Sequence, residues 1–265
     1  MVRAKPLRCG ATLTKFSTNK IQGRVKNHPA SFSVPISMAN QADPEAEFQN
    51  ELRVFDNDVD EVVQCFYIWR TVHAAGRKSR RVYDLLNRNA GFWVVALGSV
   101  QANSLIALGR IFDNSRDSHN IGRLLKLIEK NPSIFSKAAL RKRKEKDLAN
   151  ALHLVDNVMR DVKEPTASDF NWLNAFVEKR RKIYGKCYKQ IRDKRYAHKQ
   201  RMDISALVAQ TNTRELAKLV TDLSNLHGIL WHWYRNGVKP QTVRLRKTVG
   251  ADIVKMTQKF VRSMP

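Results

Sequence analysis

Apolar residues recur at three- and four-residue steps along most of the chain from Asp43 onward, and this helical spacing constrains the fold more than any other feature. Asp43 is expected to cap a first helix that Pro44 begins and Gly76 ends. Similar runs start at residue 168 and at either Asp203 or Thr213. Strand-like alternation is confined to residues 242–245. The sequence therefore predicts an all-α helical bundle with short extra helices.

Composition divides the chain into three segments. Residues 1–42 are predicted to be a disordered basic tail, since the first 37 residues hold seven Lys/Arg, no acid, and no apolar run long enough for a signal peptide. Met38 leaves open an alternative start of the native protein. Residues 43–237 are predicted to form the bundle, and residues 238–265 a basic C-terminal extension.

The most apolar segment, residues 90–108, approaches the length of a membrane span. Because Gln101, Asn103 and Ser104 interrupt it, we expect a buried central helix of the bundle and no membrane partner. Shorter helices are expected at residues 82–86, at 119–129 after a cap at Ser118, and at 133–162 from Ser133.

Charge indicates the kind of partner. The 48 Lys/Arg exceed the 24 Asp/Glu and give a net charge of +24, which favours a polyanion such as nucleic acid. Basic clusters recur at residues 77–81, 141–146, 179–182, 192–201 and 244–247. Each cluster alone is typical of a solvated helix face, whereas together they predict a surface that follows phosphates.

Residues 192–201 are the most informative stretch for chemistry. Arg192 and Asp193 precede His198, with five residues between Arg192 and His198. Phosphodiester cleavage needs such a set: a permanent cation, a carboxylate and a side chain that titrates near neutral pH. On an uninterrupted helix Arg192 and His198 would lie nearly two turns apart, so a break near residues 194–197 would favour catalysis.

Other chemistries find little support. The chain has no phosphate-binding glycine loop, no dinucleotide fingerprint, no zinc-protease motif and no glycine-flanked nucleophilic serine. The acids of the first helix lack a histidine at ligand spacing, and His227 and His232 are expected to be packing residues. We expect no metal and no cofactor. The three scattered cysteines indicate a reducing, cytoplasmic compartment; they are Cys9, Cys65 and Cys187.

The stretch from Arg192 to His198 resembles the signature of the HEPN superfamily of helical-bundle ribonucleases. Residues 92–97 running to 107–113, with the following segment 121–128, resemble its abortive-infection AbiU-type branch. The resemblance covers roughly residues 48–234.

The resemblance implies a metal-independent endoribonuclease that acts as a homodimer. His198 would be general base on the ribose 2′-OH or general acid on the leaving oxygen, while Arg192 stabilises the phosphoryl charge. Asp193 would orient Arg192 or His198, and a second His198 would come from the partner subunit across a twofold axis.

RNA phosphates would be held by basic residues near the motif. These are Lys194, Arg195, Lys199, Arg201, Lys179, Arg180 and Arg181. Some family members are silenced by a nucleotidyltransferase that modifies a tyrosine just after the histidine. Here Lys199 and Gln200 follow His198, so Tyr196 would have to substitute. The resemblance thus adds an antitoxin or a nucleotidyltransferase as a possible partner, with Tyr196 as the residue that would be modified.

Three hypotheses remain open from the sequence. The favoured one is a ribonuclease of defence or toxin type. The second is a non-catalytic nucleic-acid-binding helical module, and the third is an interaction protein for acidic partners. Cleavage of RNA that persists in EDTA separates the first from the others, and salt-dependent RNA affinity separates the second from the third.

Overall fold

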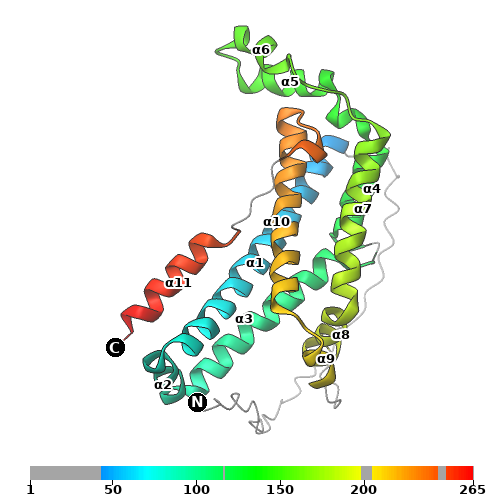
Figure 1. Cartoon of the computed structure of the whole chain (residues 1–265). Coiled ribbons are helices and arrows are strands. Elements are labelled where there is room, and N and C mark those ends of the chain that lie inside the picture. The colour runs from blue at the N-terminus through cyan, green and yellow to red at the C-terminus, as the bar shows by residue number, and fades with distance from the viewer. Residues whose placement is uncertain (1–42, 116, 198–204, 244–248, 265) are drawn as a thin grey trace, which may run out of the picture. The chain divides into compact units, whose positions relative to one another are not determined.

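The computed structural model describes residues 43–115, 117–197, 205–243 and 249–264. Every regular element within these residues is a helix, which confirms the all-α prediction (Figure 1). The longer helices are α1 (Pro44–Lys78), α2 (Arg80–Arg88), α3 (Ala90–Ile111), α4 (Ile121–Lys130), α5 (Lys137–Asp147), α7 (Ala167–Ile183), α10 (Thr213–Asn236) and α11 (Ala251–Ser263). The shorter elements are η1 (Pro132–Phe135), η2 (Leu152–Leu154), α6 (Val155–Met159), η3 (Tyr184–Tyr188), α8 (Lys189–Ile191), η4 (Arg192–Ala197), α9 (Ser205–Ala209) and η5 (Pro240–Thr242).

One hydrophobic core joins α1, α3, α4, α7 and α10. Aromatic rings from α1, η1 and α10 pack together in this core. The Phe135 and Trp233 rings stack with centroids 4.3 Å apart, and Phe48 meets Phe135 edge-on at 5.2 Å. Such ring pairs add to the free energy gained by area burial alone. The periodic apolar residues of α1 and α10 thus face the same interior, as their spacing predicts.

The two ends of α1 differ in how well the sequence predicts them. Asp43 caps α1 as predicted, because its Oδ1 accepts the Glu45 backbone N–H at 3.0 Å. Gly76 does not end this helix, and the prediction of a stop there is wrong. The helix continues to Lys78. A Cβ at Gly76 would lie 3.1 Å from Leu86 Cδ1, so the absence of a side chain at Gly76 allows α2 to pack closely against α1.

The segment after α3 departs from the prediction in two places. Asn120, not Ser118, caps α4 by accepting the Arg123 backbone N–H at 2.9 Å. The single helix expected over residues 133–162 is instead η1, α5, η2 and α6. The chain folds back there because Leu140 and Val155, with neighbouring apolar residues, bury in a small second cluster away from the main core.

The helices that frame the site, α7 and α10, begin near two of the predicted starts, residues 168 and 213. A capping box between Thr166 and Asp169 starts α7, and Asn212 caps α10. Gly237 ends α10 in the left-handed conformation at φ 62°, which glycine adopts without strain. Residues 244–245 of the strand-like stretch lie outside the described residues, and Thr242 belongs to η5.

The two halves of α3 differ in burial. Its C-terminal half, from Ser104 to Ile111, packs into the bundle. Phe92 and Val95 of the N-terminal half are 65% and 68% exposed, so the prediction of a wholly buried central helix is wrong. Within the described residues α3 alone has the length and apolar composition that crossing a membrane requires.

Residues of the predicted C-terminal extension include α11, which packs along α1 (Figure 1). Val249 and Val261 are buried there, and Arg81 of α2 donates to the Met264 carbonyl at 2.9 Å. Gly250 has φ 74°, and a Cβ on it would lie 2.6 Å from Tyr67 Cε2. The glycine therefore serves both the turn and the close approach to α1.

Candidate active site

A long helical run from α7 through η4 carries the motif from Arg192 to Ala197, and the run widens to a π-helix twice. The residues of η3 and of η4 are π-helical, with α8 between them. Such wide turns are rare and occur frequently at functional sites. This part of the run is buried against the core through Tyr184, Cys187, Tyr188 and Ile191.

Arg192 opens the second π segment and pairs with its neighbour. Its Nε donates to Asp193 Oδ1 at 2.7 Å, and its Nη2 contacts the same oxygen. The guanidinium side chain lies against the backbone of Gly109 in α3, and 26% of the Arg192 side chain is exposed. The cation is thus held in place while part of it stays accessible to a ligand.

Asp113 follows α3 and adds a second carboxylate near Arg192. Its Oδ1 accepts backbone N–H groups of Asn114 at 2.7 Å and Ser115 at 3.2 Å, and its Oδ2 accepts the Ser118 hydroxyl at 3.2 Å. Burial favours the protonated acid, but these bonds and the Arg192 charge outweigh it and hold the pKa of Asp113 below its usual value. We refer to Gly109, Asp113, Arg192 and Asp193 as the Arg192 cluster.

Tyr184 lies close enough to this cluster for the charges of Arg192, Asp193 and Asp113 to act on its hydroxyl. Its ring stacks on Phe112 with centroids 5.1 Å apart and planes at 20°. Burial raises the pKa of Tyr184 to about 12, with Asp193 and Asp113 adding to the effect and Arg192 opposing it. Its buried hydroxyl has no hydrogen-bond partner within the described part of the chain. The phenol therefore stays protonated at neutral pH.

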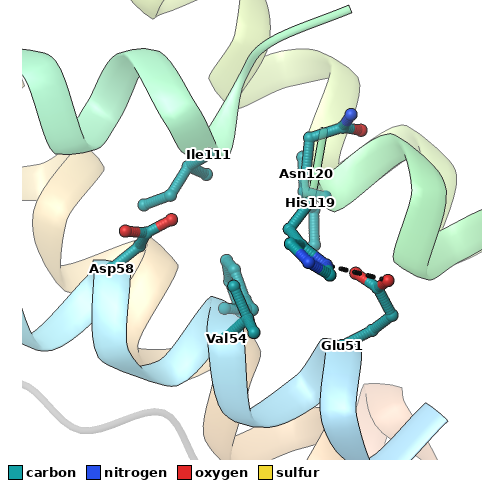
Figure 2. Close-up of a pocket in the computed structure, with 8 residues that line it drawn as sticks. Glu51, Val54, Asp58, Ile111, His119 and Asn120 are labelled. Atoms are coloured by element: carbon teal, nitrogen blue, oxygen red, sulfur yellow. Dashed lines mark hydrogen bonds and ion pairs between the residues drawn. The ribbon is translucent and has the colours of Figure 1, made fainter. Parts of the chain in front are cut away.

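A small pocket beside the Asp113 loop shows how the loop is fixed (Figure 2). Glu51 of α1 is only 2% exposed, and its Oε1 contacts His119 Nδ1 at 3.0 Å and Arg123 Nε at 2.8 Å. Two cationic or hydrogen-bonding partners compensate this buried carboxylate. The network ties the end of the loop and the start of α4 to α1.

The predicted RNA-binding residues that the structure describes fall into two groups. Lys179, Lys194, Arg195 and Arg181 are exposed or half-buried. Arg180 is instead 12% exposed, where its Nε donates to Asp222 Oδ2 of α10 at 2.9 Å. That ion pair leaves Arg180 little freedom to contact a phosphate.

His198, Lys199 and Arg201 lie outside the described residues. The helical run continues through Ala197, so the break that would favour catalysis is not found within residues 194–197. Tyr196 is half-buried and directs its hydroxyl to Gln101 Oε1 of α3 at 3.5 Å.

The acids of α1 are engaged by other side chains. Arg110 donates to Asp58 at 2.7 Å and to Glu61 at 2.5 Å, and His227 contacts Asp56 at 2.9 Å. Over the described ranges, no group of three or more His, Cys, Asp or Glu residues is arranged to hold a metal ion.

Sequence reasoning missed two members of the Arg192 cluster, Gly109 and Asp113. Both lie in residues 107–113, a stretch whose resemblance to the AbiU-type branch is apparent from the sequence. What the sequence did not reveal is that this stretch passes beside Arg192.

The all-α bundle with this Arg–Asp pair late in a long helical run is the arrangement that the HEPN resemblance of the sequence implies. A family model described as AbiU2 matches residues 45–248. The match covers more than half of the 265 residues, and the chain therefore belongs to the HEPN AbiU2 family, an abortive-infection branch. No curated protein and no solved structure matches the chain.

Proposed function

We propose that the protein is a metal-independent endoribonuclease of defence or toxin type. The observation that carries the proposal is the Arg192–Asp193 pair, partly exposed at a π-helical turn in a chain of the AbiU2 family. A guanidinium in this state can exchange its carboxylate partner for a phosphodiester, because both accept the same planar pair of N–H donors. We place the activity in the cytoplasm.

The reaction follows from the chemistry of the residues. His198 removes the proton of the ribose 2′-OH, whose oxygen attacks the phosphorus, and the 5′-oxygen leaves with a proton from a second acid. Arg192 stabilises the negative charge that grows on the phosphoryl oxygens, and Asp193 orients Arg192. The products are a 2′,3′-cyclic phosphate and a 5′-hydroxyl, and DNA, which lacks the 2′-OH, is not cut.

Two proton transfers call for two histidines, and a homodimer supplies the second His198. The exposed N-terminal half of α3 supports such an assembly. Residues 90–109 contain no charged side chain in a protein of net charge +24, so two copies can approach there with little repulsion. The same helix contacts Tyr196 of the motif through Gln101, so a partner that extends along this half of α3 would approach the motif there.

The RNA is held by cations on either side of Arg192. Lys194 and Arg195 follow the Arg192–Asp193 pair in the sequence, and we assign the other phosphate contacts to Lys179, Arg181, Lys199 and Arg201. Arg180 is left out because Asp222 engages it. These residues contact phosphates and fix the RNA without reading its sequence. An antitoxin or a nucleotidyltransferase acting on Tyr196 would restrain the activity.

Cleavage of single-stranded RNA in EDTA by the purified full chain tests the proposal. His198→Ala is expected to abolish it, and mixed dimers with one altered subunit should keep much less than half of the wild-type activity if both histidines serve one cleft. Lys186→Ala, which removes an exposed charge from the same helical run, is the control and should retain activity. Cleavage by the His198→Ala homodimer would contradict the mechanism.

The dimer surface has its own test by sedimentation. Phe92→Asp places a charge on the exposed half of α3 and should give a monomer with little activity. Phe260→Asp makes the same change at an exposed phenylalanine of α11 and should leave the dimer intact. Equal sedimentation of wild type and Phe92→Asp as dimers would rule out this surface.

One observation favours a second function, that of a non-catalytic nucleic-acid-binding module. The helical run does not break between Arg192 and Ala197, so the described part of the motif stays on one helical run. In that case the protein would bind RNA with steep salt dependence but release no cyclic-phosphate product.

A further inference from the structure

Gly109 lies where the Arg192 side chain meets α3. A Cβ placed on this glycine would lie 2.5 Å from Arg192 Cδ and 3.0 Å from Arg192 Cζ, closer than carbon atoms pack without a bond. Glycine in a helix interior is less favourable than alanine, and nothing in a regular helix such as α3 calls for one. The close approach of Arg192 gives a reason for it.

The other two glycines of α3 provide a comparison. A Cβ at Gly91 or at Gly98 would meet no atom within 4 Å. Of the three glycines, only Gly109 makes room for another side chain. The atoms it admits belong to the flexible part of an arginine, so an added methyl group would displace Arg192 and leave the packing of the helices in place.

Asp113 follows the C-terminal end of α3, and its charge interacts with that of Arg192. Hydrogen bonds from Asn114, Ser115 and Ser118 fix its carboxylate. Asp193 holds the guanidinium directly. Arg192 is thus located by the backbone of Gly109 and by the carboxylate of Asp193, with the charge of Asp113 nearby.

We propose that Gly109 is a positioning residue that sets where the Arg192 guanidinium meets its ligand. The inference rests on the proposed function for the identity of that ligand, a phosphodiester group of RNA. Gly109 allows the Arg192 side chain to lie against α3, and Asp193 holds the guanidinium there. Gly109 does not touch the substrate; it acts through Arg192.

Gly109→Ala tests this proposal, with Gly98→Ala on the same helix as the matched control. The first readout is the Nε–H signal of Arg192 in the NMR spectrum of the isotope-labelled full chain, assigned by its loss in Arg192→Lys. Gly109→Ala should shift this signal and retain or raise the melting temperature, while Gly98→Ala should leave the signal unchanged. An unshifted Arg192 signal in folded Gly109→Ala would overturn the proposal.

Kinetics provides the second readout. Displacing Arg192 should lower kcat for RNA by about 10–100-fold, as small misplacements of catalytic groups do, with KM changed much less. Wild-type kcat in Gly109→Ala would refute the positioning role. If the wild type cuts no RNA, the proposed function fails while the NMR comparison still decides on Gly109.

For the event that Gly109→Ala folds poorly, a double variant separates the causes. In the Arg192→Ala background the added methyl group has room, so Gly109→Ala should then raise the melting temperature. A fall in melting temperature in both backgrounds would show that Gly109 serves helix packing and would reject its role toward Arg192.

Discussion

Arg180 and Arg192 lie on the same helical run and each pairs with an aspartate, yet the two pairs differ in what they connect. Arg180 reaches Asp222 on α10, donates to the Phe176 carbonyl and covers the Phe176 ring at 3.5 Å. Arg192 pairs with the adjacent Asp193. The comparison teaches that a buried pair between helices holds the fold, whereas a partly exposed pair between neighbours keeps a cation ready for another anion.

The largest expected effect is on the Arg180 pair. Arg180→Ala leaves Asp222 buried without its cation and should lower the free energy of unfolding by about 3–5 kcal/mol. Lys179→Ala, at an exposed neighbour, should change it by less than about 0.5 kcal/mol. Chemical denaturation measures both. A loss below about 1 kcal/mol for Arg180→Ala would show that the two arginines are equivalent.

In contrast to Arg180→Ala, the substitution Arg192→Ala should lower activity strongly and stability little. Removing a donor to a developing oxyanion lowers kcat by about 10²–10³-fold, while we expect little change in the free energy of unfolding. Arg192→Lys should also fail, because an ammonium cannot make the planar two-donor contact. Kinetics and denaturation on the same preparations provide the check, and a large loss of stability with activity retained would break the comparison.

A double substitution sharpens the comparison further. Arg180→Met combined with Asp222→Leu replaces the buried ion pair by apolar groups of similar size. Such replacements are often neutral or stabilising, so the double variant should recover most of the stability that Arg180→Ala loses. RNA affinity should fall little, since Arg180 does not face the ligand. A marked drop in RNA binding would return Arg180 to the RNA-binding surface.

The smallest effect concerns Tyr184, which lies between the two arginines in sequence. Its folded pKa of about 12 exceeds the ordinary value of 10, so its contribution to stability is complete below pH 10 and is lost as pH rises toward 12. Tyr184→Phe should flatten this decline in denaturation measured from pH 9 to pH 11. An unchanged slope would mean that the phenol is not buried as described.

Sequence reasoning succeeded where the deciding contacts are local. The Asp43 cap and the apolar faces of α1 and α10 depend on residues a few positions apart. The Arg192–Asp193 pair could be foreseen for the same reason. The structure adds what depends on distant partners: Asp222 beside Arg180 and Gly109 beneath Arg192.

The apolar segment of α3 shows the limit most clearly. Composition predicts burial along its whole length, but burial requires a neighbour, and no described element covers the side chains of Phe92 and Val95. A sequence specifies that such a face is apolar and leaves open whether its partner comes from the same chain or another.

The π-helical segments have a consequence for how the chain tolerates insertions and deletions. Each residue of an α-helix turns the side-chain direction by about 100°, and a π turn spans one residue more between its bonded groups. Deleting Gly185, whose added Cβ would meet nothing within 4 Å, removes no contact, yet it would shorten η3 and rotate Arg192 away from α3. The number of residues between α7 and Arg192 is therefore as much a requirement of the site as their identity.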